Sequence, residues 1–78
     1  MINRVTKQGE TRLRKYREKH SLTQWGLCKI ANVSVATISA IEMNGLYPTP
    51  PVREKLATAL GVSEIDIWPE LGLGDKLP

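Results

Sequence analysis

Residues that start and end helices recur at short intervals along this chain and limit it to short helices. Thr23 and Ser34 carry side-chain oxygens suited to capping a helix N-terminus, and Gly45 and Gly61 suit a left-handed residue after a helix C-terminus. No segment alternates apolar and polar residues with the period of two that marks a half-buried strand. The sequence therefore predicts an all-α fold, a compact bundle of about five helices with short connections.

The spacing of apolar residues places the helices between these signals. Leu13 and Tyr16, for example, fall three residues apart and so share one helix face. Residues 10–69 would form the helical domain, preceded by a flexible N-terminal arm at residues 1–9 and followed by a loosely held C-terminal tail at residues 70–78. Within the domain, helices are expected over residues 10–19, 24–31, 35–43, 51–60 and 64–68.

Length and composition exclude several classes of protein. A chain of 78 residues forms one domain at most, and no apolar run approaches the ~18 residues that a membrane-spanning helix needs. The single cysteine, Cys28, allows no disulfide within the chain and no metal site built on several cysteines. No targeting leader, acid–base pair, metal cluster or phosphate-binding loop is visible in the sequence. We therefore expect a cytoplasmic protein that is not an enzyme and uses no catalytic residues, cofactor, metal or membrane.

The charge is unevenly distributed along the chain. Residues 1–31 hold eight basic and two acidic residues, a net charge of +6, whereas residues 32–78 hold three basic and six acidic residues, a net charge of −3. A basic segment on a small domain favours a polyanionic partner, most often a nucleic acid. A solvated amphipathic helix explains the same charges equally well, so the charge alone leaves both interpretations open.

The most informative segment is residues 22–42, which reads LTQWGLCKIANVSVATISAIE and contains two helical stretches joined by the turn at residues 32–34. Its distinctive residues are Leu22, Thr23, Gln24, Leu27, Ala31, Val33, Ser34, Thr37, Ile38, Ser39, Ile41, Glu42 and Asn44, followed by Pro48, Leu56 and residues 59–63. In order and spacing these residues resemble the Cro/C1-type helix-turn-helix family, also called the XRE family. The resemblance covers about residues 10–68.

The resemblance implies a lambda-repressor-like fold that binds double-stranded DNA as a small prokaryotic or phage transcriptional regulator. The helix at about residues 34–43 would enter the major groove. An arginine of the first helix often pairs with a glutamate of this helix in the family, which here implies a structural ion pair between Arg17 and Glu42. The residues implied to contact the DNA backbone are Thr23, Gln24, Ser34, Thr37, Asn44 and Tyr47, and those implied to face bases are Val35, Ala36, Ser39 and Ala40.

The base-facing positions depart from the family pattern because they lack long polar side chains. Relatives often carry Gln, Arg, Ser or Asn there, whereas this helix offers only the hydroxyls of Ser39 and Thr37 and apolar contact with thymine methyls. We therefore expect weak discrimination between bases, with more weight on phosphate contacts and DNA shape. A second function stays open. The chain could be a protein-binding module on the same fold, antitoxin-like or an adaptor, that uses this apolar helix to contact another protein.

The resemblance and the small size of one binding module both favour a homodimer on a two-fold symmetric site. The candidates for the dimer surface are apolar residues near the C-terminus: Ile65, Ile67, Leu71, Leu73 and Leu77. The alternative is that these residues merely cover the core.

A few conspicuous side chains remain. Trp25 stands at a position that is usually polar in the family, and we expect it to fold back onto the first helix. The alternative for Trp25 is contact with the sugar-phosphate backbone or with a partner protein. Trp68 is expected to pack against the end of the bundle, Cys28 to be a core thiol and His20 to lie in a surface turn. Tyr47 would either donate to a phosphate or pack into the core.

Overall fold

Short helices with tight connections account for most of residues 11–76, which are the residues that the computed structural model describes, with side chains as far as residue 72. No strand occurs in this range, so the expected all-α bundle of about five helices is confirmed, and each predicted boundary lies within two residues of the observed one. The elements are α1 (Arg12–Lys19), α2 (Gln24–Ala31), α3 (Val35–Asn44), α4 (Pro50–Leu60), α5 (Glu64–Ile67) and a 3₁₀ helix (Pro69–Lys76).

Local hydrogen bonds explain where these helices begin and end. The side-chain oxygens of Thr11, Thr23 and Ser34 each accept a hydrogen bond from the backbone N–H three residues farther on, which caps α1, α2 and α3. At the other end, α3 and α4 stop at Gly45 and Gly61, whose φ angles of 72° and 71° lie in the left-handed region that glycine adopts without strain. The predicted caps at Thr23, Ser34, Gly45 and Gly61 are therefore all present.

Apolar side chains from all five α-helices meet in one core. Leu27 of α2 and Ile38 of α3 are completely buried, and each buried side chain of this size contributes about 1.5–3 kcal/mol. Trp68 is buried against the same core, as expected from the sequence. The full set is Leu13, Leu27, Ala31, Val33, Ile38, Ile41, Leu56, Ala57, Leu60, Ile67 and Trp68.

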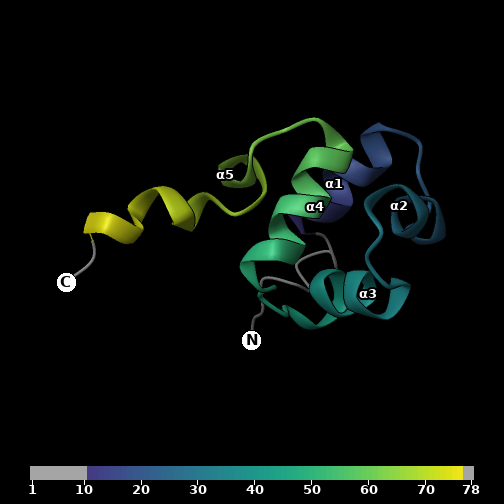
Figure 1. The fold of residues 1–78 in the computed structure, drawn as a ribbon, viewed down its shortest axis with the longest axis horizontal. Helices are drawn as coiled ribbons and strands as arrows, with labels where there is room; N and C mark the ends of the chain where they lie inside the picture. The colour runs from purple at the N-terminus through teal and green to yellow at the C-terminus, as the bar shows by residue number, and fades with distance from the viewer. Residues whose placement is uncertain (1–10, 77–78) are drawn as a thin grey trace.

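The turn between α2 and α3 fixes how these two helices lie. Asn32 adopts a left-handed conformation with φ of 61°, and its backbone N–H donates to the Cys28 carbonyl (2.9 Å). Val33 then turns into the core, which anchors the turn between the buried Leu27 and Ile38. Figure 1 shows α2 and α3 together on one side of the bundle, with the 3₁₀ helix projecting from the opposite side.

The C-terminal segment, expected to be a loosely held tail, contains a 3₁₀ helix. The 3₁₀ helix begins directly after Trp68, whose carbonyl accepts a hydrogen bond from the Leu71 backbone N–H (3.0 Å), and Leu71 packs against the core. Pro69 at the first position of this helix costs no hydrogen bond, because that N–H would have no partner within the helix. The predicted arm at residues 1–9, together with Leu77 and the side chain of Leu73, lies outside what the structure describes.

Two isolated substitutions in α2 test the position of the core. Leu27→Ala removes a completely buried side chain and is expected to lower the free energy of unfolding by about 2–5 kcal/mol. Ile30→Ala, three residues farther on, removes a side chain that is 57% exposed and is expected to change stability by less than about 0.5 kcal/mol. Urea denaturation followed by circular dichroism measures both, and equal effects would contradict this assignment of the core.

Candidate nucleic-acid interface

The outward face of α3 carries small, uncharged side chains. Ala36 and Met43 are exposed, and Val35, Ser39 and Ala40 are half-buried. The opposite face of the same helix is buried through Ile38, Ile41 and Glu42. The residues predicted to face bases therefore lie outside the buried face of α3.

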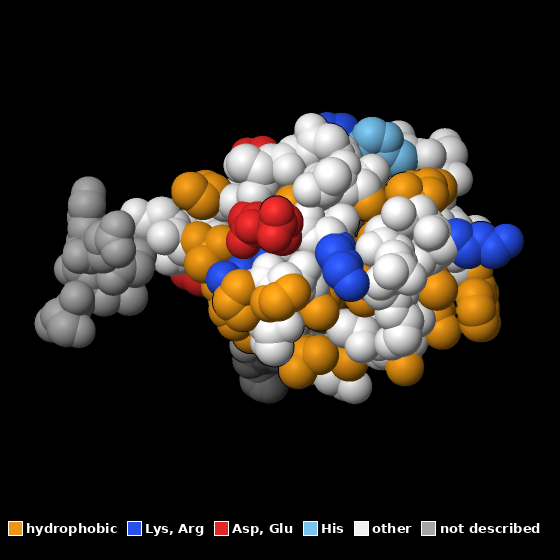
Figure 2. Space-filling model, viewed as in Figure 1, with side chains coloured by type: hydrophobic (Ala, Val, Ile, Leu, Met, Phe, Trp, Pro, Cys, Tyr) orange, Lys and Arg blue, Asp and Glu red, His pale blue; other side chains and the backbone are white. Residues whose placement is uncertain are grey.

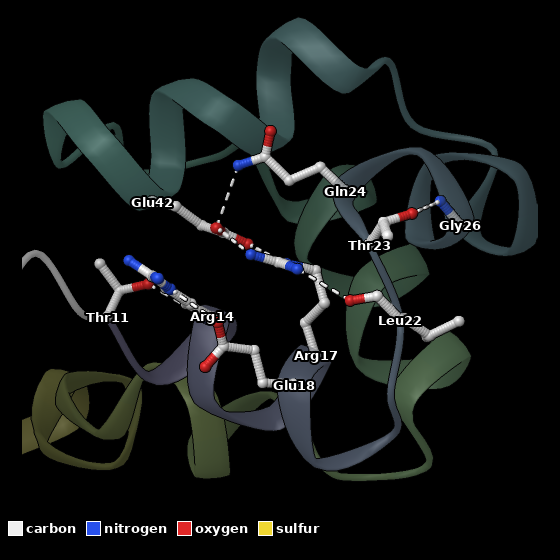
Figure 3. Close-up of polar contacts among 9 residues, drawn as sticks. All are labelled: Thr11, Arg14, Arg17, Glu18, Leu22, Thr23, Gln24, Gly26 and Glu42. Atoms are coloured by element: carbon white, nitrogen blue, oxygen red, sulfur yellow. Dashed lines mark hydrogen bonds and ion pairs between the residues drawn. The ribbon is translucent and has the colours of Figure 1, made fainter.

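Glu42 is the one acidic residue of α3, and it points into the domain rather than outward. Its two carboxylate oxygens accept hydrogen bonds from Nε and Nη2 of Arg17, at 2.8 and 2.9 Å, in a bidentate ion pair (Figure 3). The remaining Arg17 nitrogen, Nη1, donates to the Leu22 carbonyl (2.8 Å). The hydrogen bond to Glu42 raises the pKa of Arg17, against the opposing effect of burial, so the arginine keeps its charge inside the protein.

Gln24 also contacts this ion pair, and the sequence did not predict that contact. Its Nε2 donates to Oε1 of Glu42 (3.1 Å), so the first turn of α2 is tied to the last part of α3 (Figure 3). One amide N–H of Gln24 is thus engaged within the protein, and the second N–H and the carbonyl oxygen remain for another partner. Gln24 and Glu42 are 18 residues apart, and the local sequence carries no signal for this contact.

Two of the hydroxyls predicted to contact phosphates, those of Thr23 and Ser34, also act as helix caps. Thr23 Oγ1 accepts from the Gly26 N–H (2.9 Å), and Ser34 Oγ accepts from the Thr37 N–H (3.1 Å). The Ser34 hydroxyl in turn donates to Thr37 Oγ1 (2.8 Å). Each hydroxyl has one donor and two acceptor positions, so Thr23 and Thr37 keep an O–H for an outside acceptor while the Ser34 hydroxyl is fully used as a donor.

The segment after α3 places its predicted contact residues at the surface. Asn44 is exposed at the end of α3, and Tyr47 is 48% exposed, which excludes packing of Tyr47 into the core. The Arg53 guanidinium lies over the Tyr47 ring, 5.2 Å from its centre, and also donates to the Pro48 carbonyl (3.1 Å) and to Glu64 (3.2 Å). Arg53 therefore holds this loop against α4 and α5.

Two expectations about α2 are wrong, and one geometric fact explains both. Trp25 is 65% exposed instead of folding back onto α1, and Cys28 is half-buried at the edge of the core rather than within it. Leu27 points directly into the core, and each residue along an α-helix turns by about 100°. Trp25 is therefore rotated by about 200° from the core direction, and Cys28 by about 100°. His20 is exposed, as expected.

The ion pair predicts unequal effects of two glutamate substitutions. Glu42→Gln leaves the Arg17 charge without its partner in a site where the Arg17 side chain is 11% exposed, and is expected to cost about 3 kcal/mol of unfolding free energy. Glu18→Gln breaks an exposed pair with Arg14 and is expected to cost about 0.5 kcal/mol or less. Guanidinium denaturation of both variants measures the difference, and a Glu42→Gln variant as stable as Glu18→Gln would refute the structural role of the pair.

Comparison with known proteins supports the interpretation of α2 and α3 as a helix-turn-helix. The chain matches the family model HTH_3, described as helix-turn-helix, over residues 13–67, which is more than half of its length. No match is found among curated proteins or among solved structures. Among the described residues, no helix is long and apolar enough to cross a membrane, and no cluster of three or more His, Cys, Asp or Glu residues is placed to hold a metal ion. The chain belongs to the Cro/C1-type (XRE) helix-turn-helix family of DNA-binding, non-enzymatic domains.

Proposed function

We propose that this chain is a small cytoplasmic transcriptional regulator, of prokaryotic or phage type, that binds duplex DNA with α3 in the major groove. The supporting observation is the contrast between the two faces of α3. Its inner face is fixed by Ile38, Ile41 and the Glu42–Arg17 pair, and its outer face is free of such contacts. A helix held in this way can enter the ~12 Å major groove without a change of shape.

Base readout would rest on apolar contact. Val35, Ala36 and Ala40 present methyl groups that suit the C5-methyl of thymine, the one apolar group on a base edge in the major groove. Ser39 adds a single hydroxyl, which bonds to either a donor or an acceptor on a base. This set discriminates less strongly than the bidentate contacts of Arg, Asn or Gln, so DNA shape would carry a larger share of the selectivity.

Contacts with the DNA backbone would position the domain on the duplex. We assign these contacts to the ends of α2 and α3 and the loop after α3. Gln24 would use the amide N–H that Glu42 leaves free, and Thr23 and Thr37 their remaining O–H groups. The complete set is Thr23, Gln24, Ser34, Thr37, Asn44 and Tyr47, of which Ser34 would have to turn its O–H away from Thr37 to donate to a phosphate.

A homodimer on a two-fold symmetric site completes the proposal. Two linked modules bind far more tightly than one, because the second contact becomes intramolecular. Ile67 is buried in the core of its own domain, so it does not serve as a dimer contact. Ile65 is 51% exposed and Leu71 is half-buried, which supports a dimer surface that includes α5.

The apolar outer face of α3 and the exposed Trp25 also suit a second function, a protein-binding module of antitoxin-like or adaptor type. The two functions differ in the physical nature of the partner. DNA binding depends on neutralising phosphate charge and weakens with salt, whereas an apolar protein contact is nearly insensitive to it.

The first test is therefore binding to a random-sequence duplex at low salt. Fluorescence anisotropy of a labelled duplex is expected to detect binding, with the logarithm of the affinity falling linearly as the logarithm of the salt concentration rises, by ~0.9 for each phosphate neutralised. A protein that does not bind any duplex at low salt would contradict the proposal and favour the protein-binding alternative.

The second test addresses the thymine contacts. On a sequence selected from a random DNA pool, replacing thymidines of the contacted half-site by deoxyuridine removes methyl groups and leaves base pairing intact. Each methyl lost from contact with Val35 or Ala36 is expected to cost about 0.8 kcal/mol, which corresponds to about a fourfold loss of affinity. Deoxyuridine outside the site is the control, and unchanged affinity within the site would exclude readout by methyl contact.

A further inference from the structure

Trp25 is the most exposed large hydrophobic side chain among the described residues, at 65% of its accessible area. An exposed indole gives up most of the stabilisation that burial would provide, so its exposure has no structural benefit within the domain. It occupies the second position of α2, directly after Gln24, which is tied to α3 through Glu42. Its backbone is therefore fixed relative to α3.

The chemistry of the exposed indole defines what it can bind. Within the described part of the chain, the exposed Trp25 Nε1–H makes no hydrogen bond. An indole N–H donates and never accepts, so it fits a partner rich in acceptors. Phosphate oxygens are acceptors only, and the deoxyribose beside them offers an apolar surface for the ring.

Within α2, the residues around Trp25 include one positive charge and no negative charge. Lys29 lies four residues farther along α2, on the same helix face, and is exposed. No acidic residue occurs anywhere in α2. Figure 2 shows basic and hydrophobic side chains next to each other at the surface on the side of the molecule where α2 and α3 lie. An exposed cation beside the ring favours a polyanionic partner such as the phosphate backbone of a nucleic acid.

We propose that Trp25, together with Lys29, binds the sugar-phosphate backbone of duplex DNA beside the groove that α3 enters, an inference that rests on the proposed function. The indole N–H donates to a phosphate oxygen, the ring packs on the sugar, and the Lys29 ammonium neutralises phosphate charge. The contact involves no base, so it raises affinity for all sequences equally.

Substitution of Trp25 tests the contact directly. Trp25→Ala is expected to weaken binding about tenfold, both to a selected site and to a random duplex, leaving the ratio between them unchanged. Trp25→Phe keeps an aromatic ring and loses the N–H, so its affinity is expected to fall between those of Trp25→Ala and the wild type. Ile30→Ala, which removes an exposed side chain from another face of α2, is the matched control and is expected to bind like the wild type. Thermal unfolding should be the same for all variants.

Tryptophan fluorescence supplies a second measurement on the unmodified chain. Acrylamide is expected to quench the exposed Trp25 and to spare the buried Trp68, and saturating duplex should protect Trp25 from quenching. If Trp25→Ala binds within twofold of the wild type and quenching is unchanged by DNA, the inference is overturned while the proposed function stands. If Trp25 becomes protected as protein concentration rises without DNA, the surface joins two copies of the chain and the inference is equally overturned. Failure of the wild type to bind any duplex refutes the proposed function itself.

Discussion

The carboxylate of Glu42 holds three helices together from inside the domain. It receives two hydrogen bonds from Arg17 of α1 and one from Gln24 of α2, while its own backbone belongs to α3. Much of the attraction in a buried ion pair is offset by the loss of hydration, so the main effect of such a pair is on geometry. The bidentate fork allows one orientation of Arg17, and this sets how α3 lies on the rest of the bundle.

The same interaction determines the character of the outer face of α3. The one charged residue of this helix is used inside the domain, and the side chains left outside are small and uncharged. Under the proposed function, electrostatic attraction to DNA would come from other parts of the domain, namely the basic residues of α1 and Lys29 of α2. In that function the buried face would fix the position of α3, the basic residues would attract the DNA, and the outer face of α3 would read DNA shape and thymine methyl groups.

Caps and periodicity made the helices predictable, because both are local properties of the sequence. Thr23, Ser34, Gly45 and Gly61 act within a few residues of their own positions, and all four were identified. The side chain of Gln24 was not predictable in this way, because its partner Glu42 becomes a neighbour only after α2 and α3 pack. The prediction for Trp25 was wrong because the helix phase set by Leu27 turns this side chain to the surface. The 3₁₀ helix was missed because glycine and proline, which end α-helices, are compatible with its tighter turns.

Because the buried and outer faces of α3 are separate, side chains on the outer face can be substituted without disturbing the core. Ala36 and Met43 are exposed and not part of the hydrophobic core, so substitutions at them leave the packing of Ile38 and Ile41 intact. Surface substitutions of this kind usually alter stability by no more than about 0.5 kcal/mol. The scaffold therefore tolerates a library of side chains at these positions, and new binding preferences can be selected on it without redesigning the fold.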